Sequence, residues 1–306
     1  MKRLGVHLAD ALVDASAGRS DIWVIDGDLG DSYGLFDEEG RPRFSQFLQA
    51  GIAEQSMVAA AAGLATTGKR PWVFSFSAFL CHRAADQIRT CVAHQQLPVV
   101  LVGSHAGAAT GPNGSSHASL GDLGVIGSIG GIAQWAPADL LDVRAAVADL
   151  LATSHPAYIR LSREPSAVLP LGPGPIRTNG LSGEVVLLST GFASHWAAEA
   201  VSELSRRGHP VPWAHIASLS VSMLRSFLEL HPRMSVAIVV EDHRVVGGLA
   251  DALRRLAPPR LFVQGLGWPA GWHGESGSID ELRQAHGLDL AALIRCIEYW
   301  QDRGPR

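Results

Sequence analysis

The chain has 306 residues, enough for two domains, and its 47% hydrophobic and 18% charged residues are typical of a globular protein with a sizeable core. Its net charge of −4 argues against a nucleic-acid partner, and no apolar run is long enough for a membrane helix. The N-terminal segment MKRLGVHLADALVDA is too polar for a signal peptide. The three cysteines, Cys81, Cys91 and Cys296, have no metal-binding spacing, so we expect a reducing, cytoplasmic setting.

Helical and strand patterns alternate along the N-terminal half of the sequence. Apolar residues at helical spacing predict the helices, and short apolar runs ending in glycine or polar residues predict the strands. In chain order we expect helix 4–15, strand 21–26, helix 56–66, strand 70–76, helix 82–94, strand 97–102, helix 120–128, strand 131–135, helix 140–153 and strand 157–161. Such alternation predicts a parallel sheet with helices on its faces.

Polar or glycine-rich loops follow several of these strands, the longest being GSHAGAATGPNGSSH over residues 103–117. Open α/β sheets place ligands at the carboxyl ends of their strands, so we interpret this loop as part of a pocket and expect none of it in the core. Its two histidines, His105 and His117, supply hydrogen-bonding groups. A surface turn with incidental histidines is the alternative.

Other candidate pocket residues stand at the ends of neighbouring elements. They are Asp28 and Ser32 after the first strand, Glu54 at the start of helix 56–66, Phe76 and Phe79 after strand 70–76, and Arg163 after strand 157–161. Each has a purely structural alternative: a turn with a helix cap, a capping acid, or core aromatics. Helix 56–66 is almost entirely Ala, Val, Met and Gly, which predicts burial on all sides.

The Pro- and Gly-rich segment 171–180 is the expected linker between a domain at 1–170 and a domain at 181–306. The second half alternates again, so the whole chain is predicted as α/β, with two domains that each have a mainly parallel sheet flanked by helices. Its expected elements are strand 185–189, helix 195–208, strand 212–217, helix 221–230, strand 236–240, helix 247–256, strand 260–264 and helices 279–285 and 290–302.

Five motifs in order resemble the second half of transketolases, the pyrimidine-binding and C-terminal domains. They are Gly51-Ile52-Ala53-Glu54, the pair Phe76 and Phe79 before Arg83-Ala84-Ala85-Asp86-Gln87-Ile88-Arg89, the span from Ser104 to His117, Leu161-Ser162-Arg163, and Glu241-Asp242-His243 with Gly247-Gly248. The resemblance covers nearly the whole chain, and five motifs at family spacing are far more specific than one.

The resemblance implies a role for each candidate residue. Glu54 would hydrogen-bond the aminopyrimidine ring of thiamine diphosphate and so activate the cofactor, while Phe76 and Phe79 would stack on that ring. His105, Ser32 and Arg163 match positions that bind a sugar phosphate, and Arg suits phosphate because its guanidinium binds two oxygens at once. His117, as a second catalytic residue, and Asp28 match positions near the substrate hydroxyls and carbonyl. The family transfers a two-carbon ketol unit from a ketose to an aldose.

The sequence departs from the family pattern at three positions of the pocket. Asn113 stands where the family usually has an Asp that reads a donor hydroxyl, Ala118 where it has Gln, and Ala85 where it has an aromatic residue. These changes predict a roomier, less acidic pocket and a substrate other than an ordinary pentose phosphate.

Full-length members begin with a diphosphate-binding domain that carries Gly-Asp-Gly and a later Asn for magnesium. Gly27-Asp28 is followed by Leu29, so we predict no metal ligands in this chain. We expect it to be one subunit of a split enzyme, with thiamine diphosphate and Mg²⁺ (or Ca²⁺) held mainly by a second subunit in a heterotetramer with two copies of each chain.

Three alternative functions stay open at this point. A 2-oxoacid dehydrogenase β subunit has the same two domains, although the His105–His117 loop favours sugar-phosphate enzymes. A deoxyxylulose-phosphate-synthase-like subunit would use a pyruvate donor. A catalytically silent structural partner is the third, and the presence of Glu54, His105, His117 and Arg163 argues against it.

Overall fold

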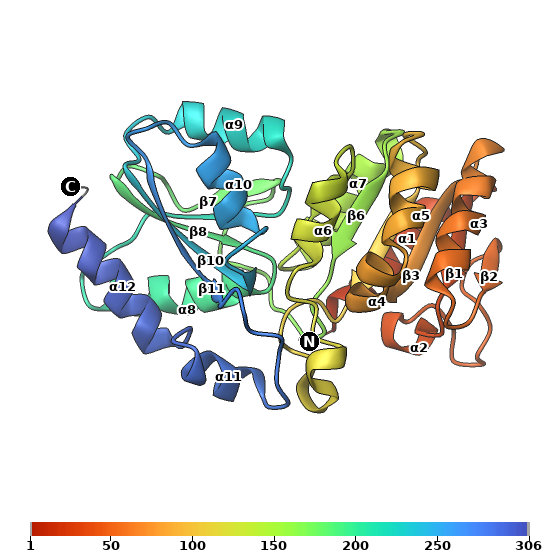
Figure 1. Ribbon diagram of the computed structural model, residues 1–306, viewed down its shortest axis with the longest axis horizontal. Coiled ribbons are helices and arrows are strands. Elements are labelled where there is room, and N and C mark those ends of the chain that lie inside the picture. The colour runs from red at the N-terminus through yellow and green to blue at the C-terminus, as the bar shows by residue number, and fades with distance from the viewer. Residues whose placement is uncertain (1, 305–306) are drawn as a thin grey trace.

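A computed structural model describes residues 2–304, except the side chains of residues 111 and 112. Two sheets lie next to each other, each with helices on both faces, and their parallel strands run toward the junction between them (Figure 1). The prediction of two α/β halves with mainly parallel sheets is therefore confirmed. Within the described residues, no helix has the length and apolarity needed to cross a membrane.

The N-terminal half contains six strands and the first set of helices. The strands are β1 (Ile22–Asp26), β2 (Phe47–Gln49), β3 (Arg70–Phe76), β4 (Val100–Ser104), β5 (Ala133–Trp135) and β6 (Ala157–Arg160). The helices are α1 (Leu4–Ser16), α2 (Gly30–Tyr33), α3 (Glu54–Thr66), α4 (Ser77–Arg83), α5 (Ala85–Gln87), the π-helical η1 (Ile88–Ala93), the 3₁₀ turn η2 (Gly111–Ser116), α6 (Asp122–Ile129) and α7 (Leu140–Ala152).

The first sheet has the order β2-β1-β3-β4-β6-β5, and all its neighbouring strands are parallel. Alternate residues of β3 face opposite sides: Trp72 and Phe74 pack with α1 and α7, whereas Val73 packs with α3 and α4. Burial on both faces explains why these strands are continuous apolar runs. Strand order reverses between β1 and β3, so a crevice is expected beyond their carboxyl ends.

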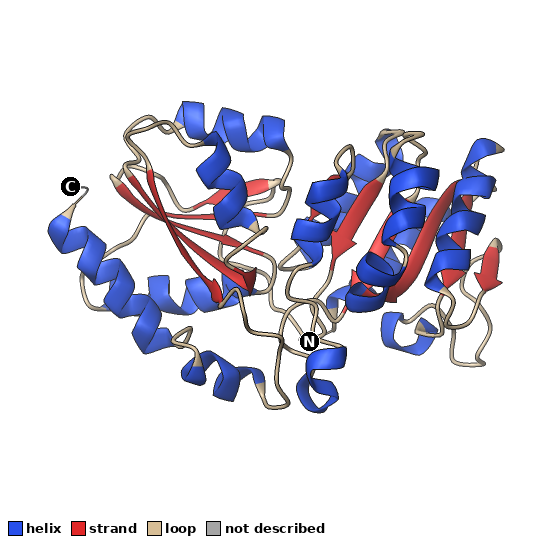
Figure 2. Cartoon of the chain, viewed as in Figure 1, coloured by secondary structure: helices blue, strands red, loops and turns tan. Residues whose placement is uncertain are grey.

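The C-terminal half contains the second sheet, with the order β11-β10-β8-β9-β7, in which only β7 is antiparallel to its neighbour (Figure 2). Its strands are β7 (Ile176–Thr178), β8 (Val185–Thr190), β9 (Trp213–Ile216), β10 (Val236–Arg244) and β11 (Phe262–Trp268). Its helices are α8 (Ala193–Arg206), α9 (Val221–Leu230), α10 (Leu249–Leu256), α11 (Ile279–Ala285) and α12 (Leu290–Arg303). The short strand β7 falls inside the segment that the sequence indicated as a linker.

Buried ion pairs join the two halves. Asp139 and Asp142 form a capping box at the start of α7, and both accept hydrogen bonds of 2.9 Å from Nη1 of Arg177 in β7. His215 in β9 lies 2.8 Å from the other oxygen of Asp142. Breaking a buried pair leaves an uncompensated charge, so this cluster holds the two sheets in one arrangement.

Candidate active site

Glu54 is a buried carboxylate, only 1% exposed, at the first residue of α3. Its Oε1 accepts a 3.1 Å hydrogen bond from Ser75 Oγ on β3, and its Oε2 lies 3.5 Å from the guanidinium of Arg83. The N-cap residue of α3 is Ala53 and no side chain caps the helix, so Glu54 stands in the first turn without acting as a side-chain cap.

Four rings gather beside this carboxylate, at the ends of β3 and β4. Phe76 contacts Phe79 with a centroid distance of 5.5 Å and His105 at 4.4 Å. His117 lies edge-on to both phenylalanines, 5.3 Å from Phe76 and 5.1 Å from Phe79. The guanidinium of Arg83 lies 5.0 Å from the Phe79 ring, which links the rings to Glu54. Both phenylalanines are half-buried, so part of each ring faces outward.

His105 sits in a positively charged setting. Burial lowers its pKa to about 4, and the nearby charges of Arg163 and Arg3 lower it as well. Arg163 follows β6, and Arg3 reaches the same place because its backbone pairs with Pro165. The Nδ1 atom of His105 is 2.8 Å from Ser104 Oγ. Two arginines close to a histidine at one edge of a sheet are chemically suited to an anion.

The remaining candidates lie at the same edge without touching the rings. Asp28 follows β1, is exposed and has a φ of 66°. Ser32 is half-buried in α2, and Asn113 is exposed in η2. Within the described part of the chain, no hydrogen bond or ring contact joins these three residues to the cluster around Phe76.

The 103–117 loop differs from its prediction in its first half. Residues 103–110 are buried, and His105 is only 8% exposed, so the expectation that none of this loop belongs to the core is wrong. Asp242 of the C-terminal half covers it, because its Oδ1 accepts a 3.0 Å hydrogen bond from the Ala108 amide. A local pattern of small and polar residues could not reveal cover supplied by residues so far along the chain.

The Glu241-Asp242-His243 motif has a structural role in the described contacts. Glu241 accepts hydrogen bonds from the amides of Leu249 and Ala250 at the start of α10, and Asp242 accepts from Ala108 and Trp268. Burial raises the pKa of Glu241 to about 7 and that of Asp242 to about 6. These carboxylates tie the helix and the 103–117 loop to β10.

Helix α3 also departs from its prediction. Met57, Val58 and Ala61 are buried, but the opposite side, with Ala59 and Ala60, is exposed in this chain. Apart from Gln55, the exposed residues of the helix are small, and burial on all sides would require a surface from outside the chain.

No metal site is found in the described residues, where no three His, Cys, Asp or Glu side chains are grouped to hold an ion.

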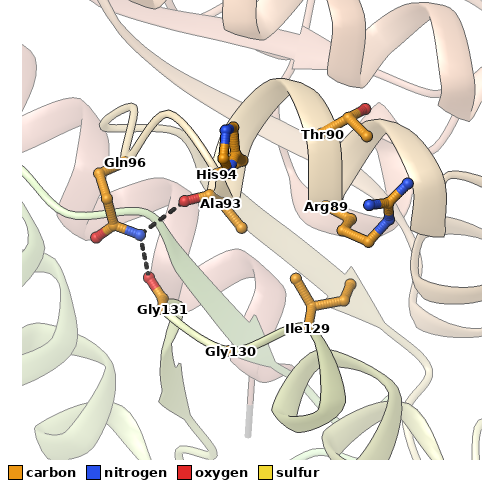
Figure 3. A pocket seen from close by; sticks show the side chains of 8 residues that line it. All are labelled: Arg89, Thr90, Ala93, His94, Gln96, Ile129, Gly130 and Gly131. Carbon is orange, nitrogen blue, oxygen red and sulfur yellow. Dashed lines mark hydrogen bonds between the residues drawn. The ribbon is translucent and has the colours of Figure 1, made fainter.

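A cavity of about 690 Å³ lies away from these residues, between η1 and the end of α6 (Figure 3). Gln96 spans its rim through hydrogen bonds to the carbonyls of Ala93 and Gly131. Because these loops precede β4 and β5, the cavity lies at the sheet edge opposite Glu54.

Comparison with known proteins agrees with this geometry. Residues 5–166 match the pyrimidine-binding domain of transketolases. The chain belongs to the transketolase family. It is 31% identical over 277 residues to the 6-deoxy-6-sulfo-D-fructose transketolase subunit SqwH of Clostridium sp. (strain MSTE9), covering 85% of this chain and 84% of that protein.

Other relatives of the same length are described as parts of transketolases. A putative transketolase C-terminal section of Methanocaldococcus jannaschii is 30% identical over 307 residues, covering 94% of this chain and 93% of that protein. A solved split-gene transketolase, an inactive β4 tetramer, superimposes with a TM-score of 0.82 at 25% identity over 98% of each chain. The prediction of a split transketolase subunit is confirmed at the level of the family.

The transketolase family implies thiamine diphosphate and a divalent cation, and the site fits one end of that cofactor. Glu54 is buried next to the half-exposed Phe76 and Phe79, which suits a flat ring that carries hydrogen-bonding nitrogens. For the divalent cation, the described residues contain no group of three His, Cys, Asp or Glu side chains.

Sequence analysis did not identify three residues that lie near the site. Ser75 holds Glu54, and its place between Phe74 and Phe76 on β3 could have indicated a side chain facing α3. Arg83 stands out in the sequence only as part of a motif. Arg3 had no signal, because its proximity to His105 comes from the pairing of the N-terminus with Pro165.

Proposed function

We propose that this chain is one subunit of a thiamine-diphosphate-dependent transketolase, which transfers a two-carbon ketol unit from a ketose to an aldose. The observation that carries the proposal is the buried Glu54 beside Phe76, Phe79 and His117. The chain also spans most of the length of two relatives, one described as a transketolase subunit and one as a transketolase C-terminal section. Thiamine diphosphate, when bound, supplies stabilisation of negative charge on the transferred carbon.

Each side chain then has a defined task. Glu54 holds the aminopyrimidine ring, with Ser75 fixing the carboxylate, while Phe76 and Phe79 give the ring a platform. His117 and Asp28 face the hydroxyl and carbonyl groups of the substrate. Asn113 would meet a donor hydroxyl as both donor and acceptor.

The positive cluster defines the class of substrate. Arg163, Arg3 and His105, with Ser32, suit a terminal phosphate or sulfonate, both of which present several acceptor oxygens. The relative named for 6-deoxy-6-sulfo-D-fructose supports including sulfonated ketoses among the candidates.

A second subunit would complete the enzyme. We propose that it holds the diphosphate and Mg²⁺ (or Ca²⁺), and that two copies of each chain form a heterotetramer. The exposed small residues of α3 support this assembly, because they offer a flat helix face for close packing.

Reconstitution tests the proposed function. This chain is co-purified with a diphosphate-domain chain from the same organism and supplied with thiamine diphosphate, Mg²⁺ and an aldose acceptor. Ketol transfer is then measured with a phosphorylated ketose, a sulfonated ketose and pyruvate as donors. Transfer from a ketose is expected. Turnover of pyruvate alone would instead favour the deoxyxylulose-phosphate-synthase-like alternative.

A further inference from the structure

A loop of the C-terminal half lies directly against the substrate-facing loop of the N-terminal half. In Figure 1 the blue segment between β11 and α11 runs alongside the yellow coil that contains η2. A Cβ atom placed on Gly274 would lie 2.7 Å from Ala118 Cβ and 3.5 Å from Ser115 Cα. A Cβ on Gly114 would lie 2.8 Å from Ser276 Oγ. One glycine from each loop therefore allows the two backbones to interlock.

Arg244 fixes the loop of the C-terminal half. Its amide donates a 2.8 Å hydrogen bond to the carbonyl of Leu120, just after the substrate-facing loop. Its side chain donates from Nε to the carbonyl of Trp272 at 3.0 Å, and Nη2 lies 3.3 Å from Nδ1 of His273. One residue thus holds both loops at the same place.

Trp272 gives this loop a rigid base. Its ring is 9% exposed and packs 4.6 Å from both Trp268 and His286, and its Nε1 donates to Glu275. A segment held by a buried aromatic ring and by hydrogen bonds at both ends is suited to position another group.

The part of the substrate-facing loop that is contacted includes His117. The amides of His117 and Ala118 both donate to the carbonyl of Gly114, at 3.2 and 3.1 Å, so residues 114–118 form one turn. The His117 ring leaves this turn toward Phe76 and Phe79, with Ser116 Oγ 2.8 Å from its Nδ1. A shift at Gly114 or Ala118 would therefore move the imidazole.

We propose that residues 272–276 are a positioning element of the active site, which sets the place of His117 through the contacts of Gly274 with Ala118 and of Ser276 with Gly114. The importance of His117 for turnover rests on the proposed function, whereas its placement by the C-terminal half does not.

The arrangement also gives Ala118 a different role from the roomier pocket that the sequence predicted. This residue packs against Gly274 at the junction, so the loss of a larger side chain there accommodates the loop and does not enlarge the pocket.

Gly274→Ala tests the proposal, with Gly208→Ala as its matched control, because both glycines have a positive φ, 92° and 86° respectively. Gly208 follows α8 and is exposed, and a Cβ added there would meet no atom of the described residues within 4 Å. The first readout is the imidazole NMR signal of His117 in the purified chain, assigned with His117→Asn. We expect Gly274→Ala to shift this signal and Gly208→Ala to leave it unchanged.

Ala118→Gly provides a second variant that cannot clash. It removes the methyl group against Gly274 and should broaden the His117 signal through added motion, while the chain stays folded. Unchanged His117 signals in both Gly274→Ala and Ala118→Gly, in folded protein, would overturn the positioning role.

Kinetics of the reconstituted enzyme form the second readout. A displacement near 1 Å costs on the order of 10²-fold in rate, so kcat/KM should fall about 10–100-fold in Gly274→Ala and stay constant in Gly208→Ala. Equal kinetics for the two variants would also count against the proposal. A wild-type assembly without ketol transfer would overturn the proposed function alone, because the NMR comparison still decides whether residues 272–276 place His117.

Discussion

At the residue scale, a hydrogen bond from Ser75 holds the buried carboxylate of Glu54 in place. The hydroxyl of Ser75 fixes Oε1, while the half-exposed Arg83 lies at a longer 3.5 Å from Oε2. A buried carboxylate is costly to retain for structure alone when its ionic partner, here Arg83, stays largely in solvent. This arrangement favours a catalytic function for Glu54.

Glu54→Gln is expected to lower kcat of the reconstituted enzyme by at least about 10²-fold, because an amide cannot accept a proton or supply a negative charge. Gln keeps the shape of the side chain and an acceptor for Ser75, so the circular dichroism spectrum and the melting temperature should change little. Activity within a few-fold of the wild type would remove Glu54 from the catalytic residues.

Arg163→Ala is expected to raise KM for a phosphorylated or sulfonated ketose far more than it lowers kcat. Loss of a charged hydrogen-bonding partner should cost about 2–3 kcal/mol, or roughly 30- to 150-fold in KM. A ketose without the anionic group serves as the control substrate, whose KM should be insensitive to the change. An unaltered KM for the anionic ketose would place the anion elsewhere.

His105 should make stability depend on pH. Burial and the charges of Arg163 and Arg3 lower its pKa from 6.5 to about 4 in the folded chain, so the unfolded chain binds more protons between these values. Its contribution to the free energy of unfolding is therefore complete above pH 6.5 and is lost as pH falls toward 4. Relative to His105→Asn, the wild type should lose up to about 3 kcal/mol between pH 7 and 4.

Urea unfolding of both proteins at several pH values checks this prediction. The comparison with His105→Asn matters because Glu241 and Asp242, whose pKa values are raised to about 7 and 6, act in the opposite direction. Parallel pH curves for the two proteins would contradict the low pKa of His105.

The secondary-structure elements that the sequence predicted well are those with complete local patterns. Strand 70–76, helix 221–230 and helix 279–285 have the bounds that were expected, because each has a clear apolar period between strong end signals. The three-residue strands β2 and β7 were missed, since their pairing with β1 and β9 is decided by tertiary contacts.

The candidate site was predicted in part, for similar physical reasons. Glu54, Phe76, Phe79, His105 and His117 follow or precede strong elements, and the structure brings them together. Burial of residues 103–110 and the packing of Ala118 against Gly274 depend on the C-terminal half. No local pattern could have indicated them.

Helix α3 carries a prediction about assembly. Its exposed face contains Ala59, Ala60 and Gly63, and we expect it to pack against another chain. Ala60→Glu should leave the isolated chain folded, because Glu is a good helix former at an exposed position, but should prevent association by placing an unpaired charge in the interface.

Sedimentation velocity with the partner subunit measures this effect. Ala291→Glu is the matched control, since it adds the same charge to an exposed alanine on α12 of the other half. Normal assembly of Ala60→Glu would show that α3 does not form the interface.

On the scale of the whole molecule, the chain presents the two ends of the expected cofactor unequally. The pyrimidine end finds Glu54, Phe76 and Phe79, whereas no group of metal ligands is present in the described residues. Most of the binding free energy for a doubly charged diphosphate comes from its metal ion and from hydrogen bonds to it. Because the described residues show no group of metal ligands, we expect that contribution to come from the partner subunit.

We therefore expect the isolated chain to bind thiamine diphosphate poorly and to be inactive, and the addition of the partner subunit to restore both binding and turnover. Titration calorimetry with thiamine diphosphate and Mg²⁺, on this chain alone and then on the assembly, measures the difference. Glu54→Gln in the assembly is an informative control, because it should weaken activity far more than cofactor affinity if the partner subunit supplies most of the binding. Micromolar affinity and full turnover by this chain alone would mean that it holds the diphosphate and the metal itself, and would overturn the split-enzyme proposal.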